Sequence, residues 1–374
     1  MKIVIVGPAF PYRGGISDTN HRLAQALIEA GHELEMITFT LQYPKFLFPG
    51  TTQYHENEMH FNYLVERKIN AINPFNWLII GFYLSQKKAD LLIFRYWLSF
   101  LAPCLGTIGW VVKCFSKTRN ISIVDNMIPH EPKFFDTLFS KYFLSAMHQL
   151  VSMSDKVTKD IQRFTKNKDV AYAPHPVFDN FGAAVSKDEA RIKLGLDLDK
   201  KYLLFFGFIR KYKGLDLLIE AFNKLILEKN DIHLIIAGEF YENDLPYKML
   251  ISDFKIENKV HLFNQFIPHD EVKYYFAASD LVVQPYRNAT QSGIAQIAYH
   301  FEKPMLITNV GGLAEIVLQD VSGVVVEPNP ISIYEGLVHF FKIEKDWTEG
   351  VRSKKKRFSW ENLVKAIEDL YSKN

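Results

Sequence analysis

The chain has 374 residues, 48% of them hydrophobic and 23% charged, and a formal net charge of +2. This composition is typical of a globular protein and excludes a disordered one, and the length predicts two domains. The near-neutral charge, with no recognition motif, excludes a dedicated nucleic-acid binder. Only Cys104 and Cys114 are present, so we expect no disulfide framework and a reducing compartment.

The chain begins with the apolar run 3–7, which we interpret as a buried strand and not as a signal peptide, because it is too short. We therefore expect a cytoplasmic protein. The segment 96–112 carries no charge but contains Pro103 and two glycines. Three interpretations stay open for it: a helix buried beside a sheet, a face that docks on a bilayer, and a membrane span, for which it falls slightly short.

Strand and helix signals alternate along the whole chain. The first half has a helical pattern at 18–30, ending at Gly31, and apolar strand-like runs at 3–7, 34–39, 91–94, 121–124 and 170–172. The second half has such runs at 202–206, 232–237, 260–263, 281–284, 305–307 and 323–326. Apolar strands that alternate with helices predict parallel sheets covered on both faces. We expect an α/β protein with two doubly wound, Rossmann-like domains facing a central cleft, and a polar linker near 177–200.

Two loops of the first half are candidate site loops because they follow strands of a parallel sheet. Gly14 and Gly15 lie between the first strand and the first helix, where glycine permits close approach of a ligand to the backbone. Asn126 and His130 follow the strand at 121–124.

The second half contains a cationic loop and a polar loop. The cationic loop starts at Gly207, directly after a strand, and contains Arg210 and Lys213, side chains that suit a diphosphate. The polar loop opens a helix, whose free N–H groups and dipole favour an anion; it comprises Thr290, Gln291, Ser292, Gly293 and Ile294. We expect a second helix start of this kind at Gly311 and Gly312, with Glu315 just inside it.

Several motifs together resemble the retaining, GT-B fold glycosyltransferases of "group 1", a family 4-like group. The resemblance runs from residue 2 to about 371. It rests on the paired glycines at 14–15 and on the second-half runs 213–222, 235–238, 260–263, 278–281, 303–308 and 311–317.

The resemblance implies a donor bound mainly by the second domain and an acceptor bound mainly by the first. Lys213 matches the family lysine that holds the diphosphate, whereas Phe208 occupies the usual arginine position, so that Arg210 is the substitute. His130 matches a first-domain histidine region of the family. We expect His130, Arg210 and Lys213 to be catalytic.

The family also carries two glutamates, whose positions fall here at Ala289 and Ile297. Neither side chain can accept a hydrogen bond, which leaves open an altered or lost activity. Thr290, Gln291 and Ser292 are then the candidates for contacting the sugar or the phosphates, and Gln296 for the ribose. We expect Gly14, Gly15, Asn126, Gly207, Gly293, Ile294 and Glu315 to complete the donor site.

The expected domains are 1–180 for the acceptor, 181–355 for the nucleotide sugar, and a helix at 356–374 that packs back on the first domain. The co-substrate is a UDP- or GDP-linked sugar, without cofactor or metal. The expected partners are a glycan or lipid-linked acceptor and the inner face of the cell membrane, contacted peripherally through the first domain. A nucleotide-sugar epimerase and a non-catalytic sugar-nucleotide-binding protein stay open as alternatives.

Overall fold

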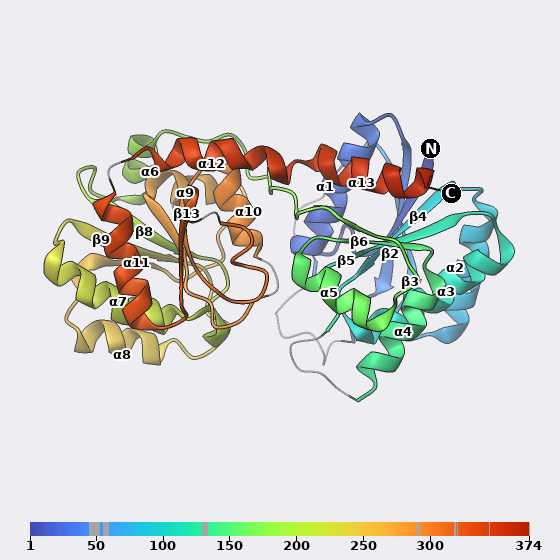
Figure 1. The fold of residues 1–374 in the computed structure, drawn as a ribbon, viewed down its shortest axis with the longest axis horizontal. Helices are drawn as coiled ribbons and strands as arrows, with labels where there is room; N and C mark the ends of the chain where they lie inside the picture. Colours follow the sequence, from blue (N-terminus) through green and yellow to red (C-terminus); the bar gives the residue numbers. More distant parts are fainter. Residues whose placement is uncertain are drawn as a thin grey trace. The chain divides into compact units, whose positions relative to one another are not determined.

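The structure is a computed structural model that describes residues 1–44, 53–54, 60–128, 134–289, 292–317, 319, 321–343 and 345–373. The chain forms two compact units (Figure 1). Unit 1 comprises Met1–His175 and Trp360–Asn374, and unit 2 comprises Pro176–Ser359. Both are parallel sheets with helices on their faces, so the predicted α/β class with Rossmann-like domains is confirmed.

Unit 1 contains a seven-stranded parallel sheet in the order β3-β2-β1-β4-β5-β6-β7. Its strands are β1 (Lys2–Val6), β2 (Glu33–Leu41), β3 (Leu64–Asn70), β4 (Leu91–Tyr96), β5 (Arg119–Val124), β6 (Gln149–Ser152) and β7 (Val170–Tyr172). The helices are α1 (Gly15–Glu29), α2 (Pro74–Gln86), η2 (Ser99–Leu101), α3 (Ala102–Phe115), α4 (Asp136–Ala146), α5 (Asp155–Phe164) and α13 (Trp360–Ser372).

Two apolar layers cover the sheet of unit 1. Residues of α2, α3 and α4 pack on one layer, and residues of α1 and α13 pack on the other. The helix α13 is fixed there by polar contacts as well, because Gln149 Nε2 donates to the Leu370 carbonyl at 2.6 Å and His32 Nε2 lies 2.9 Å from Glu368 Oε1.

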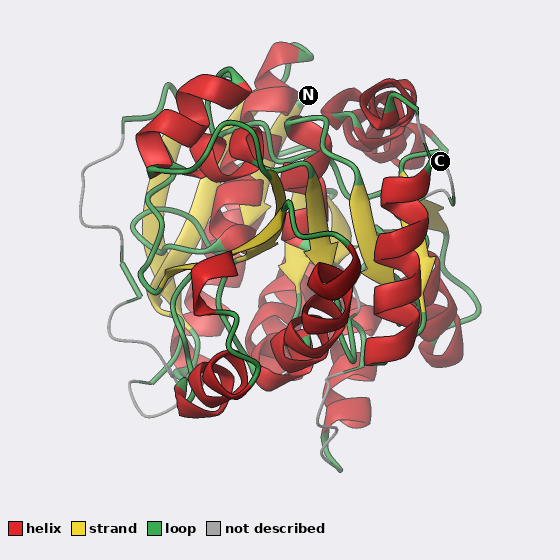
Figure 2. Ribbon diagram, turned by 90° about the vertical axis from the view of Figure 1, so that its left-hand side faces the viewer, coloured by secondary structure: helices red, strands yellow, loops and turns green. Residues whose placement is uncertain are grey.

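Unit 2 contains a six-stranded parallel sheet in the order β10-β9-β8-β11-β12-β13. Its strands are β8 (Lys201–Phe206), β9 (Ile232–Ala237), β10 (Val260–Phe263), β11 (Leu281–Gln284), β12 (Met305–Thr308) and β13 (Gly323–Val326). The helices are α6 (Lys187–Leu194), η3 (Lys211–Lys213), α7 (Leu215–Glu228), α8 (Leu245–Asp253), η4 (Glu257–Lys259), α9 (Val272–Ala278), α10 (Gly293–His300), α11 (Pro330–Lys342), α12 (Trp347–Lys355) and η5 (Lys356–Phe358). Figure 2 shows strands lying between layers of helices.

The structure corrects two expectations about local structure in unit 2. The stretch near 177–200 is not a linker, because it contains α6, capped by Ser186, with Ala190 and Leu196 in the core of unit 2. Residues 311–317 form turns and no helix, so the second helix start expected at Gly311 and Gly312 is wrong. Two neighbouring glycines disfavour a helix at that point.

The uncharged segment 96–112 is mostly α3, and eight of the residues of α3 are buried. Glycines allow this close packing: a Cβ on Gly81 of α2 would lie 2.5 Å from Val111 Cβ, and one on Gly106 would lie 2.8 Å from the Tyr142 ring. The segment is therefore a mostly buried helix, and docking of its neighbourhood on a bilayer stays open. Among the described residues, no helix has the length and apolar character needed to cross a bilayer.

Candidate functional site

The centre of the sheet in unit 2 is its topological switch point. The strand β8 lies beside β11, with β9 and β10 on one side and β12 and β13 on the other. The carboxyl edge at such a point, where the loops after β8 and β11 begin, is where open α/β sheets generally bind ligands.

The predicted residues Gly207, Lys213 and Ile294 meet at this edge. Gly207 has φ +97°, and a Cβ on it would lie 3.1 Å from Lys213 Nζ and 3.1 Å from Ile294 Cδ1. Only glycine fits this conformation without strain. The loop after β8 and the start of α10 thus form one continuous surface around the Lys213 ammonium group.

Lys213 is a buried cation, with 7% of its surface exposed. Within the described part of the chain its ammonium group has no carboxylate partner, and its nitrogen lies 5.6 Å from the centre of the Tyr286 ring. Burial, and then the charge of Arg210, lower the pKa of Lys213 from 10.5 to about 8. Two cations held together without a counter-ion are unfavourable in the empty protein and favour an anionic ligand.

Arg210 is exposed, and its guanidinium carbon lies 5.0 Å from the centre of the Tyr241 ring. It lies just before η3, whose C-terminal Gly214 has φ +67°. A Cβ on Gly214 would lie 2.1 Å from the Pro285 carbonyl oxygen, so the two loops approach each other as closely as their backbones allow.

An ion pair that the sequence did not indicate joins the same two loops. Arg287 donates to both carboxylate oxygens of Asp216, at 2.7 and 2.6 Å, and also to the Lys211 carbonyl at 3.1 Å. Burial raises the pKa of Asp216, but the hydrogen bonds and the charge of Arg287 outweigh burial and hold the pKa below its usual value. A planar guanidinium held at two points fixes orientation as well as distance.

The helix α10 starts with Ser292 as its cap. The Ser292 hydroxyl donates to Gln284 Oε1 at 2.5 Å and accepts from the Ala295 N–H at 3.4 Å, so it is engaged within the protein. Gly293 lies against Phe178, because a Cβ there would come within 2.7 Å of the ring. Thr290 and Gln291 lie outside the described residues.

The two positions of the family glutamates are apolar and buried. Ala289 and Ile297 are each 4% exposed and belong to the core of unit 2. Gln296, the residue expected at the ribose, is 1% exposed, and its Oε1 atom has no hydrogen-bond partner among the described residues. A buried amide oxygen without a partner is energetically costly.

Aromatic rings, two of them exposed and one half-buried, lie along the carboxyl edge beside Arg210. Phe208 follows β8, Tyr241 follows β9 and Phe266 follows β10. The Phe208 ring is 4.4 Å from that of Tyr241 and 6.4 Å from that of Phe266, and 39% of Phe208 is exposed. The sequence reading recorded Phe208 only as a departure from the family arginine and missed this group.

Unit 1 has its own switch point, between β1 and β4. A buried network lies there that the sequence reading missed: Arg95, 1% exposed, donates to both carboxylate oxygens of Asp125 at 2.5 and 2.6 Å, and to Asn20 Oδ1 at 3.4 Å. The signal that would have found it is a lone arginine inside the apolar strand β4.

Gly14 and Gly15 are exposed at the same edge, at the start of α1, and a Cβ on either would meet no atom within 4 Å. Asn126 directly follows Asp125, and its side chain makes no hydrogen bond within the described ranges. His130 lies outside the described residues. Glu315 lies in the turns that follow β12. The described residues contain no group of three His, Cys, Asp or Glu side chains that could hold a metal ion.

Comparison with known proteins agrees with the fold. Residues 186–357 match the family described as "Glycosyl transferases group 1". An uncharacterized glycosyltransferase of Methanocaldococcus jannaschii is 25% identical over 99% of this chain and 98% of its own length. A D-inositol 3-phosphate glycosyltransferase of Xylanimonas cellulosilytica is 23% identical over 77% of this chain and 73% of its own length.

Two solved structures share the architecture. The sucrose-phosphate synthase of Thermosynechococcus elongatus superposes with a TM-score of 0.73 at 16% identity, covering 99% of this chain and 98% of its own. The Anabaena protein HepE in complex with UDP superposes with a TM-score of 0.75 at 14% identity, covering 100% of both chains. The fold is that of GT-B glycosyltransferases, and the findings support the group 1 glycosyltransferase family, with the family match confined to unit 2.

Proposed function

We propose that this protein transfers a sugar from a UDP- or GDP-linked donor to a glycan or lipid-linked acceptor, with retained anomeric configuration and without a metal ion. The observation that carries the proposal is the meeting of Lys213, Arg210 and the start of α10 around Gly207, at the switch point of unit 2. These groups present positive charge without a carboxylate, as a diphosphate requires.

In the proposed reaction the bond between the anomeric carbon and the diphosphate oxygen breaks while the acceptor oxygen bonds to that carbon on the same face. The leaving phosphate takes the acceptor proton, so no separate protein base is needed. Lys213, Arg210 and the free N–H groups at the start of α10 stabilise the negative charge that builds up on the phosphate. Loss of one such donor typically costs about 10²–10³ in rate.

The aromatic group supports a place for the nucleobase. The ring of Phe208 is exposed beside Arg210 and backed by Tyr241 and Phe266. Stacking on an aromatic ring contributes about 1–3 kcal/mol per base. We place the base on Phe208, with the diphosphate extending toward Lys213.

Gln296 is the proposed ribose contact, since its buried Oε1 atom has no partner. We propose that His130 is catalytic. We propose that donor binding also involves Gly14, Gly15, Asn126, Thr290, Gln291, Ser292 and Glu315. The relatives named for sugar transfer, and the HepE complexes with UDP and UDP-glucose, support a nucleotide sugar. We also propose a peripheral contact between unit 1 and the inner face of the membrane.

Calorimetric titration with UDP, GDP and ADP tests the donor site directly. We expect UDP or GDP to bind, and Lys213→Ala to lose that binding while keeping its melting temperature. Lys211→Ala is the matched control, because Lys211 is an exposed lysine of the same loop. No affinity for any of the three nucleotides, or an unchanged affinity in Lys213→Ala, would rule out the proposed site.

Product analysis tests the chemistry. With the donor identified, NMR of the product should show the anomeric configuration of the donor, and an excess of EDTA should leave the rate unchanged. An inverted product or loss of activity in EDTA would contradict the respective part of the proposal. Conversion of the donor sugar without any acceptor would indicate an epimerase instead.

A further inference from the structure

The outward face of α2 is apolar where a surface helix is normally polar. The helix contains no charged residue. Its side chains Phe75, Ile79 and Phe82, spaced along one face, are 78%, 63% and 43% exposed, and Leu78 is 44% exposed. The opposite face holds Ile80 and Leu84 in the core.

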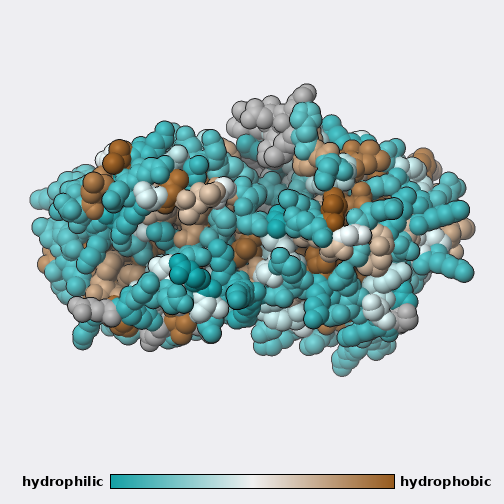
Figure 3. Space-filling model, turned by 90° about the horizontal axis from the view of Figure 1, so that it is seen from above, coloured by the Kyte–Doolittle hydropathy of each residue, from teal (hydrophilic) through white to brown (hydrophobic). Residues whose placement is uncertain are grey.

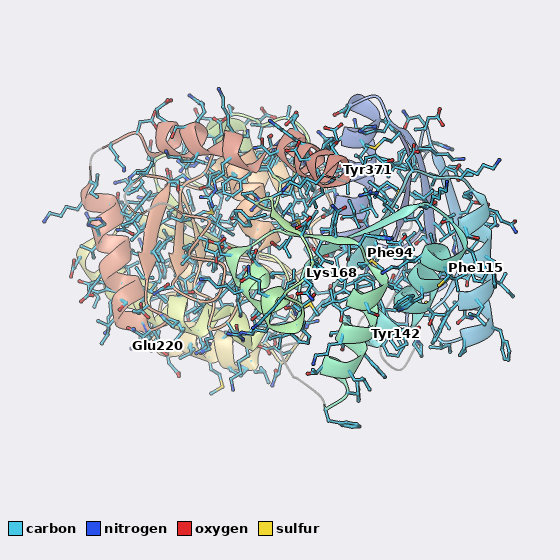
Figure 4. All side chains as sticks on the ribbon, turned by 45° about the vertical axis from the view of Figure 1, so that its right-hand side comes forward. Phe94, Phe115, Tyr142, Lys168, Glu220 and Tyr371 are labelled. Carbon is cyan, nitrogen blue, oxygen red and sulfur yellow. The ribbon has the colours of Figure 1, made fainter. Side chains whose placement is uncertain are left out.

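This apolar surface continues onto the neighbouring helices. Phe115, at the end of α3, is 63% exposed, and its ring lies 4.8 Å from that of Phe82. On the other side of α3, α4 presents Leu138, 67% exposed, and Tyr142. Figure 4 labels Phe115 and Tyr142. We call Phe75, Leu78, Ile79, Phe82, Phe115 and Leu138 the α2–α4 face.

The described part of the chain carries other exposed hydrophobic residues, such as Leu227 of α7 and Ile331 of α11. On the face drawn in Figure 3, hydrophobic residues lie in small groups among hydrophilic ones. Single exposed hydrophobic residues are normal, whereas a contiguous patch indicates an interaction surface.

The charges around the α2–α4 face are mostly positive, and Asp90, two residues after Lys88, is an exposed carboxylate beside them. Lys88 follows α2, Lys117 follows α3 and Lys141 lies on α4, and all three are exposed without an ion pair among the described residues. The one carboxylate on these three helices is that of Asp136, which is buried and accepts a hydrogen bond from Ser99 at 2.5 Å. The surface therefore combines exposed aromatic and aliphatic groups with unpaired lysines, and the helices α2, α3 and α4 themselves carry no exposed carboxylate.

We propose that the α2–α4 face docks on an anionic lipid bilayer, with its apolar side chains in the boundary of the acyl chains and its lysines at the headgroups. Amphipathic surfaces of this composition bind anionic membranes. This inference rests on the peripheral membrane contact proposed above. It assigns that contact to a surface on α2, α3 and α4. Vesicle binding needs neither donor nor transfer, so its failure would leave the proposed sugar transfer untouched.

Sedimentation of the full chain with lipid vesicles tests the proposal. We expect binding to vesicles of equal parts phosphatidylcholine and phosphatidylglycerol to be at least about tenfold stronger than to phosphatidylcholine alone. The triple variant Phe75→Ser, Ile79→Ser, Phe82→Ser should bind the anionic vesicles at least about tenfold more weakly than the wild type does. The matched control replaces three exposed hydrophobic residues of unit 2, in Leu227→Ser, Met249→Ser, Ile331→Ser, and should bind as the wild type does.

The lysines supply a second arm. Lys88→Gln, Lys117→Gln, Lys141→Gln should lower the affinity for anionic vesicles by about fivefold per lysine, and high salt should have the same effect. Wild-type protein that does not sediment with anionic vesicles, or equal losses in the serine triple variant and its control, would overturn the proposal. The alternative occupant is a second copy of the chain. It would be assigned if the protein binds no vesicles, light scattering shows a dimer, and the serine triple variant abolishes that dimer.

Discussion

Gly207 and Lys213 are so close that a single methyl group on Gly207 would lie 3.1 Å from the Lys213 ammonium nitrogen. The backbone at Gly207 has φ +97°, so the residue is fixed both by its conformation and by the space beside it. The Lys213 ammonium group therefore occupies its position only because residue 207 has no side chain.

Gly207→Ala should weaken nucleoside-diphosphate binding by about tenfold or more, because the new methyl group displaces Lys213 or Ile294 and small misplacements at such sites are costly. Calorimetry measures the affinity. Gly182→Ala is the control, because Gly182 also has a positive φ of +80° but nothing within 4 Å of its Cβ position. Both variants should lose about 1–3 kcal/mol of stability from backbone strain, and equal affinities in the two would show that the space beside Lys213 has no role.

The pKa of Lys213, lowered to about 8 by burial and by Arg210, predicts a pH dependence of binding. Above pH 8 the free protein loses the Lys213 proton, which the bound diphosphate requires, so affinity should fall by up to about tenfold per pH unit between pH 8 and 10. Lys213→Arg stays charged, and its affinity should not change over this range. A wild-type affinity that stays constant from pH 7 to 10 would contradict the assignment.

The lowered pKa of Lys213 has the opposite effect on stability: nucleotide affinity falls as the pH rises, whereas the free energy of unfolding rises. The pKa of Lys213 is lower in the folded chain than its ordinary 10.5, so the folded state releases this proton first as the pH rises. The contribution of Lys213 to the free energy of unfolding should therefore increase between about pH 8 and 10.5. Melting curves of the wild type and Lys213→Met, compared at each pH, isolate this contribution.

The buried pair Arg95–Asp125 should be essential to unit 1. Asp125→Ala leaves the Arg95 guanidinium buried without its partner, which typically costs about 3–5 kcal/mol. A clearly lower melting temperature is expected, whereas Asp169→Ala, at an exposed carboxylate, should change stability by less than about 0.5 kcal/mol. The double variant Arg95→Met, Asp125→Leu should be more stable than Asp125→Ala, because it removes both charges.

The family glutamates cannot be restored by simple substitution. Ile297→Glu would place a carboxylate at a position that is 4% exposed, in the core of unit 2, and should cost several kcal/mol. Ile297→Leu, which keeps the volume, should cost less than about 1.5 kcal/mol. Urea unfolding measures both. Wild-type stability in Ile297→Glu would show that the position is open to solvent or ligand.

Much of the architecture was predictable because apolar strands in a parallel sheet are unbroken in sequence. All six strands of unit 2 lie where the apolar runs indicated, to within a residue at either end. In unit 1, β3 escaped notice because Glu66, Arg67 and Lys68 interrupt its pattern, as an edge strand allows. The strand β6 escaped notice because only Leu150 and Val151 are apolar in it, between two polar residues.

The candidate site was harder to read because its interactions are long-range. Spacing along the chain pointed to Gly207, Lys213 and Ile294 separately, and tertiary packing places them together. The Arg287–Asp216 pair spans 71 positions and the Arg95–Asp125 pair spans 30, so neither has a local signature. The helix expected at Gly311 failed because the glycine signal is shared by turns and helix starts.

The packing of α13 ties the order of synthesis to the order of folding. Trp360, Leu363, Val364 and Ile367 cover the same side of the sheet of unit 1 as α1, yet the ribosome makes them after the whole of unit 2. Until they emerge, that side of the nascent sheet stays partly bare. Domains generally fold as they are synthesised. Unit 1, however, emerges first and is completed last, because α13 is made after unit 2. Its uncovered side is therefore an expected target for chaperones.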